Sequence, residues 1–321
     1  MSSQVSSIRS GEIWLDTAGK PIQAHGGSVY HVNDTFYFIG ENKEHHKPGT
    51  NIWHGGVRCY SSKDLYAWQD EGVILAPVEN DSNHPLHPTR IMDRPHVLYN
   101  VRTKKFVMWV KFAGTVEDSR AWQIQYMGIA TADAITGPFT LVKTLHPMGM
   151  NSGDFDLYKD ERDGKAYIIF ERVHTELIVA DLSDDYLDVS GYYTSHLPFP
   201  GPPHTREAPA FFKVEHRYFL ISSGTTGYDP NPCDYALAPL LHGPWTSMGD
   251  PCVNDTKRTT FDSQVTSVFR HPHKKNLYIA IADRWNKQDL SDSRYVWLPL
   301  TLEGDTVRIH WRDSWRLDEF E

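Results

Sequence analysis

Pairs of short apolar stretches, each pair joined by a polar turn, recur along the whole chain. Aromatic and β-branched residues dominate these stretches, a composition typical of β-strands. Five such pairs occupy residues 28–40, 96–110, 155–170, 209–222 and 265–282. Turns such as Arg162-Asp163-Gly164 carry residues that tolerate the backbone angles of tight hairpins. No segment keeps an apolar i, i+3, i+4, i+7 stripe for three turns, so we expect no long helix.

A second hairpin follows each of the first five. Their markers lie at residues 60–68, 130–139, 179–187, 237–245 and 298–307. The units start near residues 27, 94, 154, 208 and 265, a spacing of about 55–65 residues. Four strands per unit at this period indicate an all-β, five-bladed β-propeller with four antiparallel strands per blade. We expect residues 1–321 to form one such domain; a β-sandwich or barrel is the alternative.

Two proline-rich insertions interrupt the repeat, at residues 76–92 and 196–205. Long connections without secondary structure of their own tend to carry function in compact domains. We therefore expect both insertions to lie on the face of the propeller that carries the site.

Polar side chains stand at or just before the start of each unit. They are His25, Asp93, Asp154, Glu207 and Gln264. Four of these five positions carry a carboxylate or an amide. The innermost strand of each propeller blade lines the central channel, so these side chains should converge at one mouth of it. The sequence thus predicts a cluster of acids in a funnel.

A funnel of carboxylates suits the hydrolysis of glycosidic bonds. That reaction needs a protonated carboxyl for the leaving oxygen and a second group on the opposite face of the sugar. Glu207 is the candidate acid, because burial and the Asp154 carboxylate would favour its protonated form. Its alternative role is a simple ion pair with Arg206. Asp154 would tune the acid and bind a hydroxyl, or only cap a turn, and Asp156 is its substitute.

The partner of the acid is left open between two residues. Gln264 is neutral and cannot act as an ordinary base, although its carbonyl oxygen can orient a water molecule. Asp93 is the remaining ionised group that could take a proton. The residues alone do not decide between them.

Composition narrows the range of partners. With 40% hydrophobic residues the chain of 321 residues can bury a large core, and 10 Trp, 16 Tyr and 14 Phe suit sugar-stacking surfaces. A net charge of −9 without a basic tract argues against nucleic acid. No stretch is long enough to cross a membrane. The amino terminus shows no signal-peptide pattern, so we expect a cytoplasmic protein, or a secreted one whose signal has been removed.

Metal and cofactor chemistry finds little support in the sequence. Cys59, Cys233 and Cys252 are too few and too scattered to predict a disulfide framework or a zinc site. Glu44-His45-His46 and His54 fall in a segment with Gly and Pro, where a solvated loop is the simpler interpretation. No nucleotide-binding or serine-hydrolase motif is present. We expect no cofactor and no metal.

Eight stretches of the chain resemble glycoside hydrolase family 43, especially its exo-β-1,3-galactanase branch and related galactofuranosidase-type members. They are residues 22–27, 40–43, 94–95, 206–209, 225–232, 263–264, 283–285 and 293–300. The resemblance implies that Glu207 is the acid and Asp154 its tuning residue. The family's usual first-blade Asp base is replaced here by Ala24-His25-Gly26, and the galactanase branch shares that loss and the glutamine at Gln264.

The same resemblance implies the substrate contacts. They are Gln23, Glu41, Asp93, Trp122 and Thr225. His25, at the start of the first unit, is also expected to contact the substrate. Trp122 would stack on a sugar or pack in a strand, whereas Trp285 is expected to be structural. Two departures bear on the substrate: the branch usually has Glu at Asp93 and often has Arg at Gly153.

The sequence thus predicts an inverting, exo-acting glycosidase that releases galactose from β-1,3-galactan, with an oligosaccharide or polysaccharide as its partner. The alternatives are a β-D-galactofuranosidase or α-L-arabinofuranosidase, a sugar-binding propeller without catalysis, and a glycoside phosphorylase. The last would require a cationic phosphate pocket.

Overall fold

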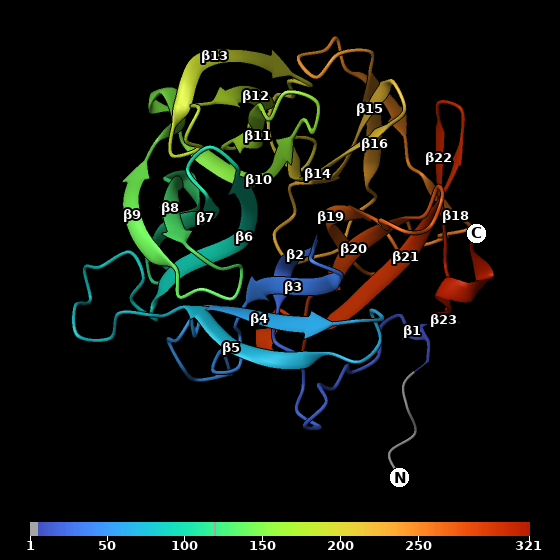
Figure 1. Ribbon diagram of the computed structural model, residues 1–321. Helices are drawn as coiled ribbons and strands as arrows, with labels where there is room; N and C mark the ends of the chain where they lie inside the picture. Colours follow the sequence, from blue (N-terminus) through green and yellow to red (C-terminus); the bar gives the residue numbers. More distant parts are fainter. Residues whose placement is uncertain (1–5, 119) are drawn as a thin grey trace.

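Five β-sheets are arranged around a common centre in the computed structural model, which describes residues 6–118 and 120–321 (Figure 1). Each sheet is formed by consecutive strands, and the strands nearest the centre are β2 (His25–Val32), β6 (Arg90–Asn100), β10 (Ser152–Lys159), β14 (Arg206–Val214) and β19 (Gln264–Arg270). The five-bladed β-propeller with four antiparallel strands per blade is confirmed, and the sandwich and the barrel are excluded. No helix in the described residues is long and apolar enough to span a membrane.

The first three blades follow the chain in order. Blade 1 contains β2 (His25–Val32), β3 (Thr35–Glu41), β4 (Val57–Ser62) and β5 (Gln69–Leu75). Blade 2 contains β6 (Arg90–Asn100), β7 (Lys105–Thr115), β8 (Tyr126–Ala132) and β9 (Thr140–Leu145). Blade 3 contains β10 (Ser152–Lys159), β11 (Ala166–Arg172), β12 (Glu176–Leu182) and β13 (Val189–His196).

The last two blades complete the ring. Blade 4 contains β14 (Arg206–Val214), β15 (Arg217–Gly224), β16 (Asp234–Ala238) and β17 (Thr246–Gly249). Blade 5 contains β19 (Gln264–Arg270), β20 (Tyr278–Arg284), β21 (Arg294–Glu303) and β22 (Thr306–His310), and adds β18 (Cys252–Val253) parallel to β22. Four 3₁₀ turns are described: η1 (Ala121–Gln123), η2 (Pro147–Gly149), η3 (Leu290–Asp292) and η4 (Leu317–Glu319).

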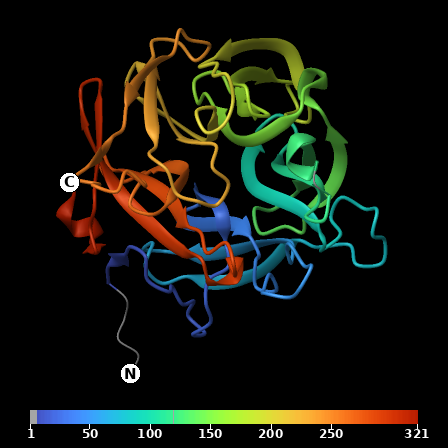
Figure 2. The ribbon, with the colours of Figure 1, turned by 180° about the vertical axis from the view of Figure 1, so that it is seen from behind.

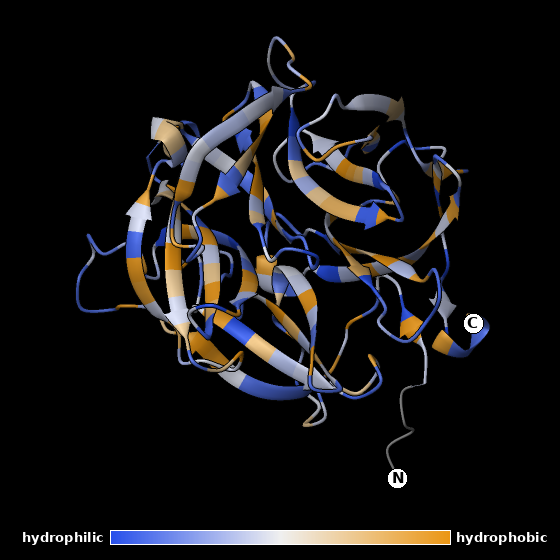
Figure 3. Ribbon diagram, turned by 45° about the horizontal axis from the view of Figure 1, so that its top comes forward, coloured by the Kyte–Doolittle hydropathy of each residue, from blue (hydrophilic) through white to orange (hydrophobic). Residues whose placement is uncertain are grey.

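Apolar clusters between neighbouring blades form the core. One cluster lies at each of the five blade junctions, and the largest joins blades 5 and 1 through residues such as Phe38 and Trp297. The ring is also closed where β1 (Ile8–Arg9) pairs with β23 (Ser314–Trp315), so the two ends of the described chain lie together at one edge (Figures 1 and 2). Strands inside the blades, such as β7, are buried on both faces, whereas the outermost strand β9 alternates between exposed and half-buried residues. Apolar and polar residues are interspersed along the strands (Figure 3).

A β-bulge near the start of each innermost strand places the candidate site residues. The register of β2 shifts between His25 and Ser28, that of β6 between Asp93 and His96, and that of β14 between Glu207 and Ala210. Bulges re-aim the side chains next to them and recur beside active sites. In β10 the shift lies between Ser152 and Phe155, so Asp154 sits within the bulge rather than before it.

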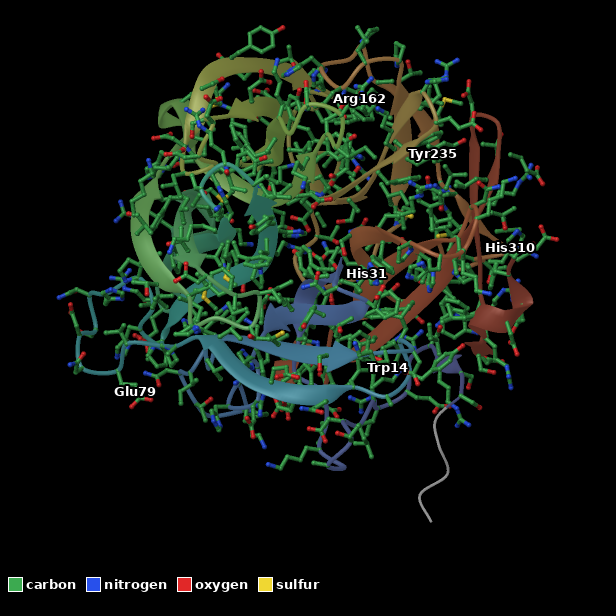
Figure 4. All side chains as sticks on the ribbon, in the orientation of Figure 1. Trp14, His31, Glu79, Arg162, Tyr235 and His310 are labelled. Carbon is green, nitrogen blue, oxygen red and sulfur yellow. The ribbon has the colours of Figure 1, made fainter. Side chains whose placement is uncertain are left out.

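The two proline-rich insertions pack against residues of the site face. Pro88 accepts a hydrogen bond at 2.6 Å from the Trp53 N–H, and Pro203 accepts one at 3.1 Å from the Thr225 N–H. The first insertion also carries Glu79 out to the rim of the ring (Figure 4). Both contacts agree with the expected position of these insertions.

Two of the three cysteines are neighbours despite their separation in sequence. Cys233 Sγ lies 3.7 Å from Cys252 Sγ, and all three thiols are free. Counting spacings could not reveal this pair, because the turn between blades 4 and 5 brings the two residues together.

Gly40 should be essential for the approach of β3 to the strand that carries His25. A Cβ at Gly40 would lie 2.2 Å from the carbonyl carbon and oxygen of Ala24, which are backbone atoms and cannot rotate away. We expect Gly40→Ala to lower the free energy of unfolding by about 1–3 kcal/mol in urea titrations. Gly114→Ala is the matched control, because its Cβ would meet nothing closer than 3.5 Å. Equal stability of the two variants would contradict the packing argument.

Candidate active site

A cavity of about 240 Å³ lies at the ends of the innermost strands where the bulges occur. It is smaller than the cavities of roughly 300–1,000 Å³ that hold drug-sized ligands. Its lining comes from all five blades. The lining residues are Glu41, Asp93, Arg94, Lys111, Trp122, Gln125, Asp154, Glu171, His174, Glu207, Thr225, Gly227, Tyr228, Gln264 and Trp285. The structure therefore brings together seven of the predicted site residues: Glu41, Asp93, Trp122, Asp154, Glu207, Thr225 and Gln264.

Asp154 is held between two cations at the base of the cavity. Its Oδ1 lies 2.7 Å from Lys111 Nζ and its Oδ2 lies 2.9 Å from Arg94 Nε. Burial by itself would raise the pKa of Asp154, but Arg94 and Lys111 together hold it below the ordinary value. Asp154 is therefore ionised at neutral pH, and it does more than cap a turn.

Asp93 is bound in the same manner from the opposite side. Lys111 Nζ lies 3.2 Å from its Oδ2, and Lys43 Nζ lies 3.2 Å from its Oδ1. The Trp53 indole N–H also donates to Oδ1 at 2.7 Å. Burial opposes ionisation, but Lys43 and Lys111 outweigh it and hold the pKa of Asp93 far below its usual range.

Glu41 extends this ion network outward in blade 1. Its Oε2 lies 2.8 Å from Lys43 Nζ, and its Oε1 accepts from the Arg94 backbone N–H at 2.8 Å. Burial and the neighbouring Asp93 raise the pKa of Glu41 to about 7 despite Lys43. The order Glu41, Lys43, Asp93, Lys111, Asp154, Arg94 thus alternates in sign from end to end.

Glu207 is the carboxylate that this network leaves without a cation. No described residue forms an ion pair with it, and its one side-chain hydrogen bond comes from Gln264 Nε2 at 3.1 Å. Burial raises the pKa of Glu207 well above the ordinary value, with further contributions from Asp154 and Glu171. The alternative pairing with Arg206 is wrong, because that guanidinium bonds the hydroxyl and carbonyl of Ser222 instead.

Gln264 is fully engaged by its neighbours. Its Oε1 accepts from Arg94 Nη2 at 2.6 Å and from Trp285 Nε1 at 3.1 Å, while its Nε2 also donates to Ser223 Oγ at 2.8 Å. Two donors face Oε1, so the amide orientation is determined and both lone pairs are used. Gln264 thus positions Glu207 and Arg94, and it could orient a water only by giving up a partner.

An aromatic arc forms part of the cavity wall. The ring centroids of Trp122 and Trp53 lie 5.6 Å apart, those of Trp53 and Tyr228 6.4 Å, and those of Tyr228 and Trp285 5.5 Å. Trp285 was expected to be structural, but it lines the cavity and donates to Gln264. Such a surface offers the apolar face of a sugar several rings to pack against.

Two predicted substrate contacts lie outside the cavity lining. Gln23 donates to the Ser291 carbonyl oxygen at 2.9 Å, and His25 is completely buried with its Nδ1 2.9 Å from Asp283 Oδ1. Asp156, the substitute for Asp154, lies deeper in the channel and accepts from the Phe211 N–H at 2.8 Å. These residues support the wall and do not face the cavity.

Several lining residues escaped the sequence analysis. Lys111 carried a usable signal, because a lysine inside an otherwise apolar strand must find a buried partner. Glu171 and His174 carried none, since neither stands at the start of a unit. Arg94 was noted only as part of a matching stretch.

Groups of potential metal ligands among the described residues lie away from this cavity. They are His31, Asp34 and His273, and Cys233, Asp250 and Cys252. Neither group includes His45, His46 or His54. Burial lowers the pKa of His54 to about 3, and its Nδ1 accepts from the Gly56 N–H at 2.9 Å. The His54 ring is therefore buried and accepts a hydrogen bond from the backbone of its own loop.

Fold and cavity together define a carbohydrate-active β-propeller, and comparison with known proteins specifies the family. The family model described as Glycosyl hydrolases family 43 matches residues 20–294. No curated protein matches the sequence. The chain belongs to glycosyl hydrolase family 43, and it is a glycoside hydrolase.

Solved structures resemble the chain over nearly its full length. One family-43 β-1,3-galactosidase is 35% identical with a TM-score of 0.88, and the match covers 99% of this chain but 65% of that one. A second, solved with galactodeoxynojirimycin, is 32% identical with a TM-score of 0.85 over 97% of this chain and 100% of that one. The exo-β-1,3-galactanase from Phanerochaete chrysosporium, solved with galactose, is 30% identical with a TM-score of 0.82, covering 96% and 68%.

Lys111 should be critical for stability, because it is shared by two buried carboxylates. We expect Lys111→Met to lower the free energy of unfolding by about 3–5 kcal/mol at neutral pH, since Asp93 and Asp154 lose a common partner. Adding Asp154→Asn should recover part of the loss, a coupling of roughly 0.5–3 kcal/mol in a double-mutant cycle. Lys105→Met is the control on the same strand, where the side chain is 44% exposed. Strict additivity of the two changes would exclude the proposed network.

Proposed function

We propose that the protein is an exo-acting, inverting hydrolase that releases galactose from the non-reducing ends of β-1,3-galactan. One observation carries this proposal: among the described residues Glu207 has no ion-pair partner, and its pKa is raised in the same cavity as two carboxylates that are held ionised. A pair of carboxyl groups whose environments separate their pKa values is what acid-assisted glycoside hydrolysis requires.

The cavity supports action at chain ends. Its small volume and its position within the ring suit a terminal sugar better than the interior of a long chain. The neighbouring structures support the substrate, because they include exo-β-1,3-galactanases from Phanerochaete chrysosporium and Clostridium thermocellum. A variant of the former with Gln in place of one Glu was solved with β-1,3-galactotriose. A complex of that kind is expected when a proton donor is replaced by an amide.

In the proposed reaction Glu207 donates its proton to the glycosidic oxygen as the bond to the anomeric carbon breaks. Water then attacks the anomeric carbon from the opposite face, which inverts its configuration. Asp93 is a weak proton acceptor, since Lys43 and Lys111 depress its pKa. We infer that its charge mainly stabilises the positive charge that develops on the sugar ring, and that the water loses its proton late, to Asp93 or to solvent.

The substrate and the stereochemistry are tested together. The purified protein should cleave β-1,3-galactobiose, and proton NMR should show α-galactose as the first-formed product from the β-linkage. The reaction should proceed without phosphate, and p-nitrophenyl β-D-galactofuranoside and α-L-arabinofuranoside should be poor substrates. Faster cleavage of a furanoside would favour the galactofuranosidase or arabinofuranosidase alternative, and β-galactose as the first product would overturn inversion.

Glu207 should set the alkaline limb of the pH profile. The acid works only when protonated, and its pKa is raised, so deprotonation of Glu207 should lower kcat/KM only at pH values above that raised pKa. The pKa of Asp93 lies below the ordinary aspartate value of about 3.9. Asp93 is therefore ionised at every pH above that value and should add no acid limb there. Glu207→Gln should lower kcat by roughly 10²–10⁴-fold and abolish the limb while galactobiose still binds.

The matched control for this variant is Glu215→Gln, an exposed glutamate at the far end of the same hairpin. It should retain wild-type activity. Equal turnover by Glu207→Gln and the wild-type protein would refute the role of Glu207, and binding without any turnover in the wild type would indicate a sugar-binding propeller.

A further inference from the structure

Glu171 occupies space in the cavity wall that only a glycine at position 153 leaves open. A Cβ added to Gly153 would lie 2.3 Å from Glu171 Oε2 and 3.5 Å from Gln125 Oε1. The Glu171 side chain is 2% exposed, yet it lines the cavity. The carboxylate of β11 therefore lies directly over the bulge of β10 that contains Asp154.

His174 fixes the direction of this carboxylate. It follows β11 with a φ of 33°, an unusual backbone angle that carries the ring back toward the cavity. Its Nδ1 lies 2.6 Å from Glu171 Oε1, and its side chain is 28% exposed at the cavity rim. No described residue donates a hydrogen bond to the other oxygen, Glu171 Oε2. Glu171 Oε1 is thus anchored by His174, and Glu171 Oε2 can accept a hydrogen bond from a ligand.

The pair lies on the acid side of the cavity. Glu171 is close enough to contribute to the raised pKa of Glu207, after burial and Asp154. The hydrogen bond that His174 donates to Glu171 raises the pKa of His174 against the effect of burial, with Asp154 also raising it and Lys111 lowering it. Asp93, at the other side, is governed by Lys43 and Lys111 instead. β11, which carries Glu171, also packs against β14, which carries Glu207, and both side chains line the same cavity. A sugar protonated by Glu207 would therefore depart beside this pair.

We propose that Glu171, oriented by His174 and accommodated by Gly153, accepts a hydrogen bond from a hydroxyl of the departing sugar. The cavity would then recognise a saccharide leaving group and not merely a terminal galactose. This inference rests on the proposed function and adds a specificity-determining residue to it. If the pair only held the turn between β11 and β12, its removal would affect all substrates equally.

The test compares a saccharide with an aromatic leaving group. β-1,3-Galactobiose presents hydroxyls to Glu171, whereas p-nitrophenyl β-D-galactopyranoside presents none on its leaving group. For Glu171→Gln we expect kcat/KM on galactobiose to fall by about 10–100-fold, the effect of losing a hydrogen bond to a charged group. The fall on the aryl substrate should be at least about 10-fold smaller.

Three further variants separate recognition from folding. Gly153→Ala should act like Glu171→Gln, because the added Cβ displaces the carboxylate. His174→Gln keeps a hydrogen-bond donor at that position and should retain more of the discrimination than Glu171→Gln. Glu176→Gln, on the same hairpin, removes a carboxylate that pairs with Arg172 outside the cavity and should change neither substrate.

The alkaline limb gives a second readout. Glu171→Gln removes a negative charge near Glu207, so the limb of kcat/KM should move to lower pH. This shift follows from the lost charge alone, so it checks that Glu171 lies near Glu207 and not what Glu171 binds. Equal losses of kcat/KM on both substrates would overturn the inference.

Binding distinguishes this inference from the proposed function. In a Glu207→Gln background, adding Glu171→Gln should lower the affinity for galactobiose by about 10-fold or more and the affinity for galactose much less, as measured by calorimetry. This binding measurement does not depend on turnover. A wild-type protein that hydrolyses nothing would therefore refute the proposed hydrolase function but not the role of Glu171. Equal loss of affinity for galactobiose and for galactose would refute the role of Glu171 but not the hydrolase function.

Discussion

The arrangement of the cavity depends on a buried row of charges that alternate in sign. Lys111 is central to it, because its ammonium group contacts Asp93 at 3.2 Å and Asp154 at 2.7 Å. Burying any of these ions alone would cost several kcal/mol, so each is tolerable only while its partners are in place. Three cations offset three of the acids, and Glu207 remains outside the row. The same row that keeps Asp93 and Asp154 ionised therefore leaves Glu207 as the group that keeps its proton.

The propeller makes such a row possible because its members come from different blades. Arg94 shows this best: its backbone N–H donates to Glu41 in blade 1, while its guanidinium reaches Asp154 in blade 3 and Gln264 in blade 5. It does so from a bulge in β6, with a φ of 53° that costs a non-glycine residue some strain. Ion pairs between blades and apolar clusters between blades thus stabilise the same ring. Removing one of these charged side chains should therefore lower the free energy of unfolding.

The fold was largely predictable from the chain, and the site was predictable in part. A period of about 55–65 residues with two hairpins per unit suffices for five blades, and the strand starts placed Asp93, Asp154, Glu207 and Gln264 in one cavity. The same rule placed His25 there, and the family resemblance placed Gln23 there, although both lie behind the wall. Strand order tells which residues approach the centre, but the bulge decides which side chain turns inward. Gln264 was one of two candidates to position the water, beside Asp93, whereas its hydrogen bonds with Arg94, Trp285 and Glu207 already satisfy its amide.

Local periodicity and residue type determined the number of blades, the order of their strands and the candidate for the proton donor. These follow from the chain alone, because hairpins form between neighbours in sequence. The partners of each charge were decided only by the tertiary structure. Lys111 finds its two carboxylate partners on other strands. Glu171 has His174 three residues away in sequence, but it meets Gly153 only where β10 and β11 pair. A pKa depends on burial and on charges within a few ångströms, and those distances exist only after the ring has closed.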